Sequence, residues 1–170
     1  MKGVLIMVKY IYTDGACSTN GDWSGGYGVV VTNEDSSIIY YAAAKYTDKT
    51  TNNREELKAM IHALDIVNDD DEYIIASDSA YVVNTCNDWI WRWSKNGWMN
   101  SKKVTVENID LIKILYNYLT TKFSKCQIVK VSGHNDVVGN EIADSLATNN
   151  MKKFNDIIEK NGIKITNKES

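Results

Sequence analysis

Residues 10–31 read YIYTDGACSTNGDWSGGYGVVV and predict two strands joined by a glycine-rich turn. The apolar and aromatic residues at both ends are typical of strands, and the segment from Gly15 to Gly26 is rich in residues that turns favour. A third strand is predicted at 38–44, after the turn residues 33–36. Three consecutive strands with short links indicate an antiparallel meander.

After the meander, the apolar pattern alternates between helical periodicity and short strand-like runs. Helices are expected at 54–67, 79–87, 109–121 and 141–149, and strands at 73–77 and 126–131. Strands that alternate with helices are typical of parallel pairing. The sequence therefore predicts an α/β fold, in which a five-stranded mixed sheet (three antiparallel strands, then two parallel) is flanked by helices.

The composition predicts one domain. The chain has 170 residues, of which 44% are hydrophobic, so it can bury a core. Residues 1–150 are expected to form the domain, and 151–170 a polar tail with one weak helical turn around Phe154.

Nothing in the sequence indicates export or a membrane. The apolar run at 4–8 is too short for a signal peptide or a membrane span. The three cysteines show no CxxC spacing, which disfavours a disulfide framework or a zinc site. We expect a cytoplasmic protein without membrane contact, monomeric and without an obligate protein partner.

Residues 89–106, called the basic segment below, differ in charge from the chain as a whole. The net charge is -3, which argues against a general nucleic-acid binder. The basic segment, however, holds four tryptophans and four basic residues and no acid. The local distribution of charge is therefore more informative than its sum.

Four carboxylates occupy positions that folding alone does not favour. Asp14 and Asp78 each end an apolar strand, Glu56 lies on the apolar side of a helix, and Asp144 lies at the edge of another. Buried carboxylates that face one another repel unless cations lie between them. Because hard oxygen ligands suit Mg²⁺ or Mn²⁺, the pattern predicts a divalent-cation site.

Each acid also has an ordinary structural explanation. Asp14 and Asp78 would suit the start of a turn, and Asp144 alone would be an unremarkable helix residue. Glu56 would suit a capping box, reaching back to the asparagine that we expect to cap the helix at 52 or 53.

Helical periodicity separates Glu56 from its neighbour Glu55. At about 100° per residue, Glu56 falls within the apolar arc, whereas Glu55 and His62 fall on the polar arc. We therefore expect Glu55 to face solvent, where the helix dipole favours a first-turn acid, and His62 to be an ordinary surface residue.

Five further motifs follow one another along the chain. They read YTDGACSTNG (12–21), TNNREEL (51–57), SDS (77–79), WSKNGW (93–98) and GHNDVVGNEIAD (133–144). Because these five motifs occur in this order, the chain resembles type 1 ribonuclease H, in the branch that carries a basic handle. The resemblance covers about residues 9–149. The resemblance implies the family's five-stranded sheet and endonucleolytic cleavage of the RNA strand of an RNA/DNA hybrid, leaving 3′-hydroxyl and 5′-phosphate ends.

The resemblance also implies the catalytic roles. It assigns metal binding to Asp14, Glu56, Asp78 and Asp144, and a supporting role in proton transfer or product release to His134, which on sequence alone would equally suit the surface. Two Mg²⁺ ions, or Mn²⁺, would activate a water and stabilise the leaving 3′ oxygen. Asp14 would bridge the ions, with Glu56 and Asp78 on one side and Asp144 on the other.

Other matching positions concern the hybrid duplex that the resemblance implies as substrate. Contacts to the RNA strand are implied for Cys17, Thr19, Asn20 and Asn52. Contacts to the DNA strand are implied for Lys49, Thr51, Trp89, Trp93, Ser101 and Asn108. Sensing the 2′-hydroxyl distinguishes RNA from DNA, while tryptophan rings and lysines suit sugars, bases and phosphates. For Trp89 and Trp93, a place in the helix core is the alternative.

The sequence departs from the family pattern at three places. Asp136 replaces a residue that is often small, Met99 stands where a lysine is common, and Glu107 stands where a neutral or basic residue is expected. The loss of basic residues predicts weaker and more salt-sensitive substrate binding than in strongly basic relatives.

Two other functions are compatible with such a fold, because a fold does not determine function. One is a transposase- or resolvase-like nuclease, which the segments containing Asn20 and Asn52 disfavour because a DNA-only enzyme needs no 2′-hydroxyl reader. The other is a catalytically inactive hybrid-binding module, which the presence of all four acids disfavours.

Overall fold

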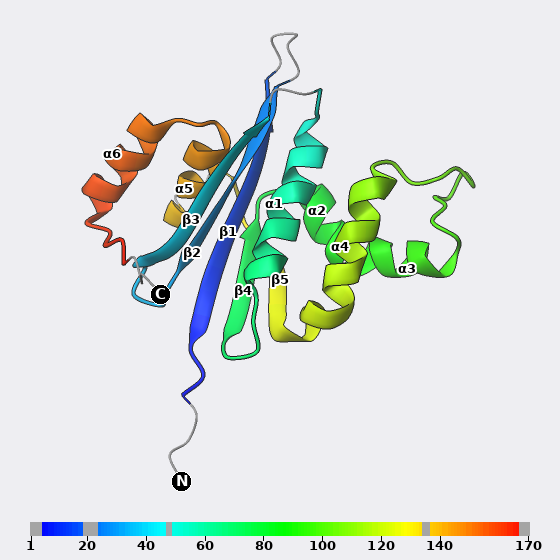
Figure 1. The fold of residues 1–170 in the computed structure, drawn as a ribbon, viewed down its shortest axis with the longest axis horizontal. Helices are drawn as coiled ribbons and strands as arrows, with labels where there is room; N and C mark the ends of the chain where they lie inside the picture. The colour runs from blue at the N-terminus through cyan, green and yellow to red at the C-terminus, as the bar shows by residue number, and fades with distance from the viewer. Residues whose placement is uncertain (1–4, 19–23, 47–48, 134–136, 167–170) are drawn as a thin grey trace.

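The computed structural model describes residues 5–18, 24–46, 49–133 and 137–166. In this part of the chain one sheet has the strand order β3-β2-β1-β4-β5 (Figure 1). The strands are β1 (Val8–Cys17), β2 (Gly25–Thr32), β3 (Ile38–Tyr46), β4 (Glu72–Ser77) and β5 (Cys126–Lys130). The helices are α1 (Asn52–Ile66), α2 (Ala80–Asn84), α3 (Ile90–Lys95), α4 (Ile109–Lys122), α5 (Val138–Ala147) and α6 (Met151–Asn161).

The pairing of the strands confirms the predicted mixed sheet. β1 pairs antiparallel with β2, and β2 with β3, whereas β4 pairs parallel with β1 on one side and with β5 on the other. Thr13 lies opposite Ser77 in the β1–β4 pair, so the residues that follow each of them emerge at the same edge. Ligand sites in α/β sheets form at such carboxyl ends.

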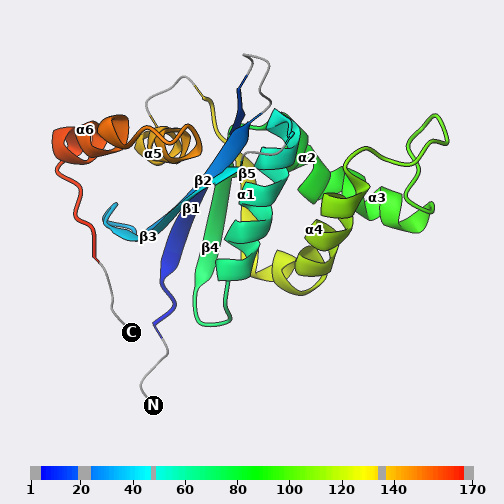
Figure 2. The ribbon, with the colours of Figure 1, turned by 45° about the horizontal axis from the view of Figure 1, so that its top comes forward.

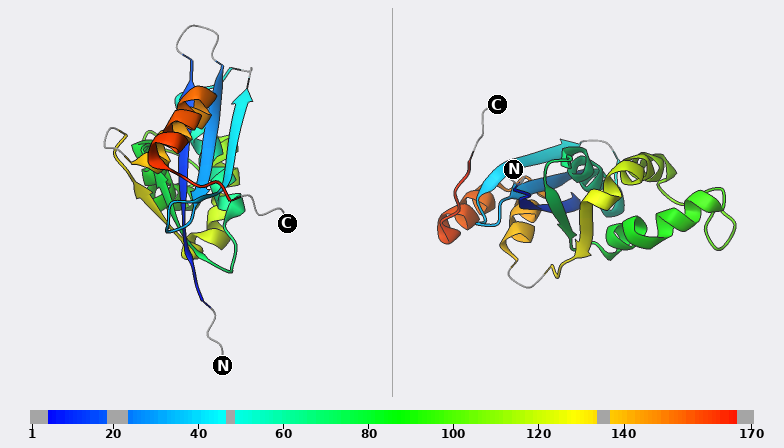
Figure 3. Two further views of the ribbon diagram at one scale, coloured as in Figure 1. Left: turned by 90° about the vertical axis from the view of Figure 1, so that its left-hand side faces the viewer. Right: turned by 90° about the horizontal axis from the view of Figure 1, so that it is seen from below.

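Helices cover both faces of the sheet, as Figures 2 and 3 show from two further directions. The alternation of side chains along β2 supplies both cores, because successive residues point to opposite faces. Val29 and Val31 belong to the core beneath α1 and α4, whereas Val30 belongs to the core beneath α5 and α6. Both cores are therefore anchored on β2, the neighbour of the strand β1 that carries Asp14.

The helix expected at 79–87 is longer and irregular. α2 continues through a π-helical turn, Thr85–Trp89, into α3. The N-terminal cap of α1 also differs, because the side chain of Thr51, rather than an asparagine, accepts the Arg54 N–H at 3.2 Å.

None of the helices in the described ranges combines the length and apolar character needed to cross a membrane.

The expected polar tail is in fact a packed helix. Phe154 and Ile157 of α6 are buried, with exposed fractions of 2% and 9%. The chain then runs beside β3, where the Ile38 N–H donates to the Lys164 carbonyl at 2.8 Å and the Thr166 N–H donates to the Ile38 carbonyl at 2.7 Å. The expectation of a tail was wrong because a polar composition can conceal one narrow apolar face, here at i, i+3 spacing.

Candidate functional site

Three of the predicted acids meet at the carboxyl edge of the sheet. Asp14 lies in the carboxyl-terminal half of β1, three residues before the strand ends, Asp78 directly follows β4, and Glu56 belongs to the first turns of α1. Each offers a carboxylate oxygen, and these atoms lie within 4.8 Å of one another. Asp14 and Glu56 are buried and Asp78 is half-buried. We call Asp14, Glu56 and Asp78 the acidic cluster.

Gly15 makes this convergence possible. A Cβ atom at Gly15 would lie 2.3 Å from the backbone nitrogen of Glu56 and 2.5 Å from the carbonyl carbon of Glu55. Only a glycine therefore allows the start of α1 to rest directly on the backbone of β1. That close approach brings Glu56 beside Asp14.

Electrostatics within the acidic cluster oppose ionisation. Burial and then the charge of Asp78 raise the pKa of Asp14 to about 7, although the Gly15 N–H donates to its carboxylate at 2.9 Å. Burial and then the charge of Asp14 raise the pKa of Glu56 well above its usual range. The cluster therefore either retains protons at neutral pH or requires a compensating positive charge.

The chemistry of the acidic cluster fits a hard divalent cation. Its donors are all carboxylate oxygens, which Mg²⁺ and Mn²⁺ prefer. One of them, Oε2 of Glu56, is buried and has no hydrogen-bond partner among the described residues. A buried anionic oxygen without a donor is costly, so a cation there would satisfy it.

Asp144 approaches the acidic cluster from the opposite face of the sheet. It lies on α5, which packs so closely on β2 that a Cβ atom at Gly28 would be 2.3 Å from the carbonyl oxygen of Ala143. Asp144 is near enough to contribute to the raised pKa of Asp14. Its Oδ2 accepts a hydrogen bond from Nζ of Lys153 at 2.5 Å. The structure thus brings all four predicted acids to one edge, with Asp144 already paired.

A cavity of about 640 Å³ opens beside these acids. It is lined by Asp78, Lys130, Ser132, Gly133, Asn140, Glu141, Asp144 and Lys153. Of these, only Asp78 and Asp144 were predicted as site residues, and Lys130, Ser132 and Lys153 lie outside all five motifs. Lysine side chains at the rim of an acidic cavity are compatible with a phosphate-bearing ligand.

Glu55 does not face solvent, contrary to the prediction. It is fully buried, and its Oε1 accepts from Thr50 Oγ1 and from Lys58 Nζ, each at 2.8 Å. The helical wheel failed here because the first turn of α1 is covered by the strand ends, where a Cβ atom at Gly25 would lie 3.1 Å from the Glu55 side chain. The pairing with Thr50 and Lys58 gives Glu55 a structural role.

His62 was also expected at the surface and is instead half-buried. Its Nδ1 lies 3.1 Å from the hydroxyl of Tyr27 and its Nε2 lies 2.7 Å from the hydroxyl of Tyr40. Burial lowers its pKa. His62 therefore connects α1 to β2 and β3, and it lies further along α1 than Glu56, the member of the acidic cluster on this helix.

The residues predicted to contact an RNA strand are described in part. Thr19 and Asn20 lie outside the described residues. His134, which was predicted to have a supporting catalytic role, also lies outside them. Cys17 Sγ donates to the Thr50 carbonyl at 3.4 Å, and Asn52 is exposed at the start of α1. Cys17 follows Asp14 on β1 by three residues, and Asn52 precedes Glu56 on α1 by four.

The residues predicted to contact a DNA strand come from the segment before α1, the helical segment 85–95 and the segment before α4. The rings of Trp89 and Trp93 are 6.0 Å apart, and that of Tyr81 is 6.3 Å from Trp89. Trp93 also packs against the core beneath α1 and α4, so part of its role is structural. Lys49, Thr51 and Ser101 are exposed.

Asn108 is connected to this aromatic group through hydrogen bonds. Its amide donates to the Tyr81 hydroxyl at 3.2 Å, and its Oδ1 accepts from Arg54 at 3.3 Å. Arg54 also forms an ion pair with Asp110 at 2.8 Å. Arg54 and Tyr81 were not predicted as site residues, although Arg54 lies within the TNNREEL motif.

Comparison with known proteins identifies close relatives. A model of the RNase H family matches residues 7–152. Ribonuclease H of Caldanaerobacter subterraneus subsp. tengcongensis is 40% identical over 144 residues, which cover 84% of this chain and 90% of that protein. Ribonuclease H of Acetivibrio thermocellus is 41% identical over 145 residues, covering 84% of this chain and 94% of the relative.

Solved structures show the same fold. The foamy viral protease-reverse transcriptase in complex with RNA/DNA hybrid aligns with a TM-score of 0.72 and 26% identity over 86% of this chain. This chain spans only 20% of that viral chain. LC11-RNase H1 in complex with RNA/DNA hybrid aligns with a TM-score of 0.60 and 22% identity, covering 85% of this chain and 97% of that one.

Proposed function

This chain belongs to the RNase H family, and from that premise we propose that it is an endonuclease that hydrolyses the RNA strand of RNA/DNA hybrids. The observation that carries the proposal is the convergence of Asp14, Glu56 and Asp78 within 4.8 Å at one edge of the sheet. Solved relatives in complex with RNA/DNA hybrid support the choice of substrate.

The four acids would hold the cations on which hydrolysis depends. When bound, a pair of Mg²⁺ or Mn²⁺ ions would activate a water for attack on the phosphodiester and stabilise the leaving 3′ oxygen, giving 3′-hydroxyl and 5′-phosphate ends. Asp14 would contribute to holding both ions, because its carboxylate lies within 4.8 Å of those of Glu56 and Asp78 and is also influenced by the charge of Asp144. We assign to His134 a supporting role in proton transfer or product release.

Two sets of residues would then orient the duplex. Cys17, Thr19, Asn20 and Asn52 are proposed to contact the RNA strand, where sensing a 2′-hydroxyl would exclude DNA. Lys49, Thr51, Trp89, Trp93, Ser101 and Asn108 are proposed to contact the DNA strand. Because Asn108 accepts from Arg54 and donates to Tyr81, these two residues would position it.

The test is one cleavage assay on three duplexes of the same sequence, RNA/DNA, RNA/RNA and DNA/DNA, each labelled on either strand. We expect Mg²⁺-dependent cuts only in the RNA strand of the hybrid, with products that a polymerase can extend from their 3′-hydroxyl ends. Cleavage of DNA/DNA would instead favour the transposase-like alternative. Binding of the hybrid without any cleavage would favour an inactive binding module.

A further inference from the structure

Lys153 contacts one of the four acids of the site, although it lies on α6, beyond the last motif of the chain. Its Nζ is 2.5 Å from Oδ2 of Asp144. Asp144 is also the acid whose oxygens lie outside the mutual 4.8 Å grouping of Asp14, Glu56 and Asp78. An ammonium group therefore already occupies a position next to this carboxylate.

Lys153 is presented by an anchored helix rather than by a free tail. The side chain of Asn150 caps α6 and accepts the Lys153 N–H at 3.0 Å. The next residue, Phe154, is buried against α5 and the sheet. The backbone of Lys153 is consequently fixed relative to α5, so that only its own side-chain torsions allow the ammonium group to leave Asp144.

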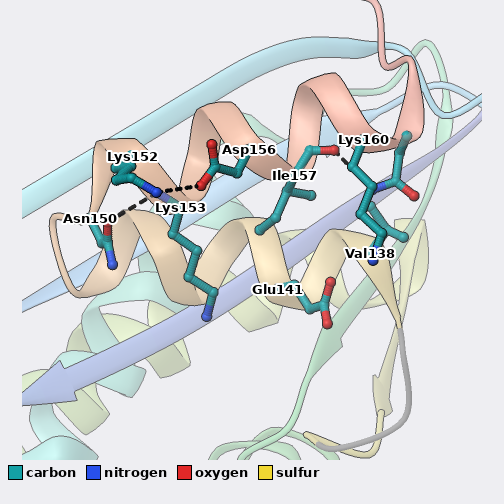
Figure 4. A pocket seen from close by; sticks show the side chains of 9 residues that line it. Val138, Glu141, Asn150, Lys152, Lys153, Asp156, Ile157 and Lys160 are labelled. Atoms are coloured by element: carbon teal, nitrogen blue, oxygen red, sulfur yellow. Dashed lines mark hydrogen bonds and ion pairs between the residues drawn. The ribbon is translucent and has the colours of Figure 1, made fainter.

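The direction of the side chain distinguishes Lys153 from its neighbour. Figure 4 shows Lys153 reaching from α6 toward α5, whereas Lys152 turns to Asp156 on its own helix. Nζ of Lys152 lies 3.0 Å from Oδ2 of Asp156, and the lysine side chain is almost fully exposed. Lys153 and Glu141 line both the cavity between α5 and α6 and the cavity beside the acids. Lys153 thus stands where the two cavities meet.

We propose that Lys153 is a positioning residue, a tethered cation that holds Asp144 and must be displaced from it when a divalent cation binds there. The inference rests on the proposed metal-binding role of the acids and deepens it. An ammonium group and a metal ion at the same carboxylate compete for its lone pairs and repel each other. Lys153 therefore weakens divalent-cation binding, and since half-exposed ion pairs are modest, the expected effect is about two- to fivefold in the dissociation constant.

The test measures Mn²⁺ binding in the absence of nucleic acid, by calorimetry and by the rise of Tm with Mn²⁺ concentration. Lys153→Gln should bind Mn²⁺ about two- to fivefold more tightly than the wild type. Lys152→Gln is the matched control, because it removes the same charge one residue away and should leave the affinity unchanged. Lys153→Arg should restore the wild-type affinity.

The inference is overturned if both glutamine variants shift the affinity equally, which would indicate a general charge effect, or if Lys153→Gln binds Mn²⁺ no more tightly than the wild type. A second comparison localises the effect. In a protein that already carries Asp144→Asn, Lys153→Gln should leave the Mn²⁺ affinity unchanged. If the affinity still changed, Lys153 would act through another residue. Failure of the proposed function looks different, because then neither the wild type nor any variant would gain Tm on addition of Mn²⁺.

Discussion

Asp14→Asn should abolish cleavage and at the same time stabilise the metal-free protein. The pKa of Asp14 rises from 3.8 to about 7 in the folded chain, because of burial first and the charge of Asp78 second. At about 1.4 kcal/mol per pKa unit, ionising this carboxyl at its buried position costs about 4 kcal/mol. Asparagine keeps the shape without the charge. We expect a gain of about 1–3 kcal/mol at pH 7, because the neighbouring Glu56 relaxes part of the repulsion by holding a proton.

The sign of the pH dependence provides an internal check. A carboxyl group whose pKa is raised by folding binds its proton more tightly in the native state than in the unfolded chain. The contribution of Asp14 to wild-type stability should therefore fall as the pH rises from about 4 to about 7, and Asp14→Asn should remove this contribution to the curve. Below about pH 4 the two proteins should differ little, since Asp14 is then protonated in both states.

The assay is urea unfolding in chelator at several pH values, together with hybrid cleavage in Mg²⁺. Asp110→Asn is a control with the opposite sign, because Arg54 lowers the pKa of Asp110 to about 2 and the same substitution there should destabilise the fold. The reasoning fails if Asp14→Asn cleaves the hybrid at the wild-type rate, or if it is less stable than the wild type at pH 7.

Three further substitutions test the fold around the site. Gly15→Ala should cost about 1–3 kcal/mol and reduce cleavage, because the new Cβ would overlap the backbone of Glu56; unchanged stability in urea would disprove the close approach. Burial lowers the pKa of His62, so below pH 6.5 the unfolded chain binds a proton at this residue more readily than the folded chain, and the contribution of His62 to stability should fall. His62→Gln should lose this part of the pH dependence in urea unfolding. Phe154→Ala should cost about 3–5 kcal/mol in thermal or urea unfolding, and a loss below about 1 kcal/mol would indicate that α6 is not part of the core.

The sequence predicted the sheet because its signals are local and strong. Apolar runs bounded by Gly, Asn and Asp define the strands, and alternation with helices determines which pairs are parallel. The meeting of Asp14 and Asp78 followed from the same reasoning, because residues at the carboxyl ends of parallel neighbours share an edge.

Other features depend on contacts that no short pattern contains. Glu55 lies on the polar arc of its helix and is nevertheless buried, because its helix begins beneath the ends of two strands. The packing of α6 depends on a few apolar side chains in a polar stretch, and the contact of Lys153 with Asp144 depends in turn on that packing. Each of these could be seen only after distant segments were brought together.

The instability of the acidic cluster and the cation binding that we propose for it would have one cause. Carboxylates held close together by the fold raise one another's pKa, and a divalent cation that binds only the folded state relieves that repulsion. By linkage, such a cation at about 100 times its dissociation constant adds about 2.7 kcal/mol to the stability of the folded state. Saturating Mg²⁺ should therefore stabilise the wild type by more than it stabilises Asp14→Asn and so reduce the difference measured in chelator. If that difference were the same with and without Mg²⁺, the repulsion within the cluster would be unrelated to metal binding.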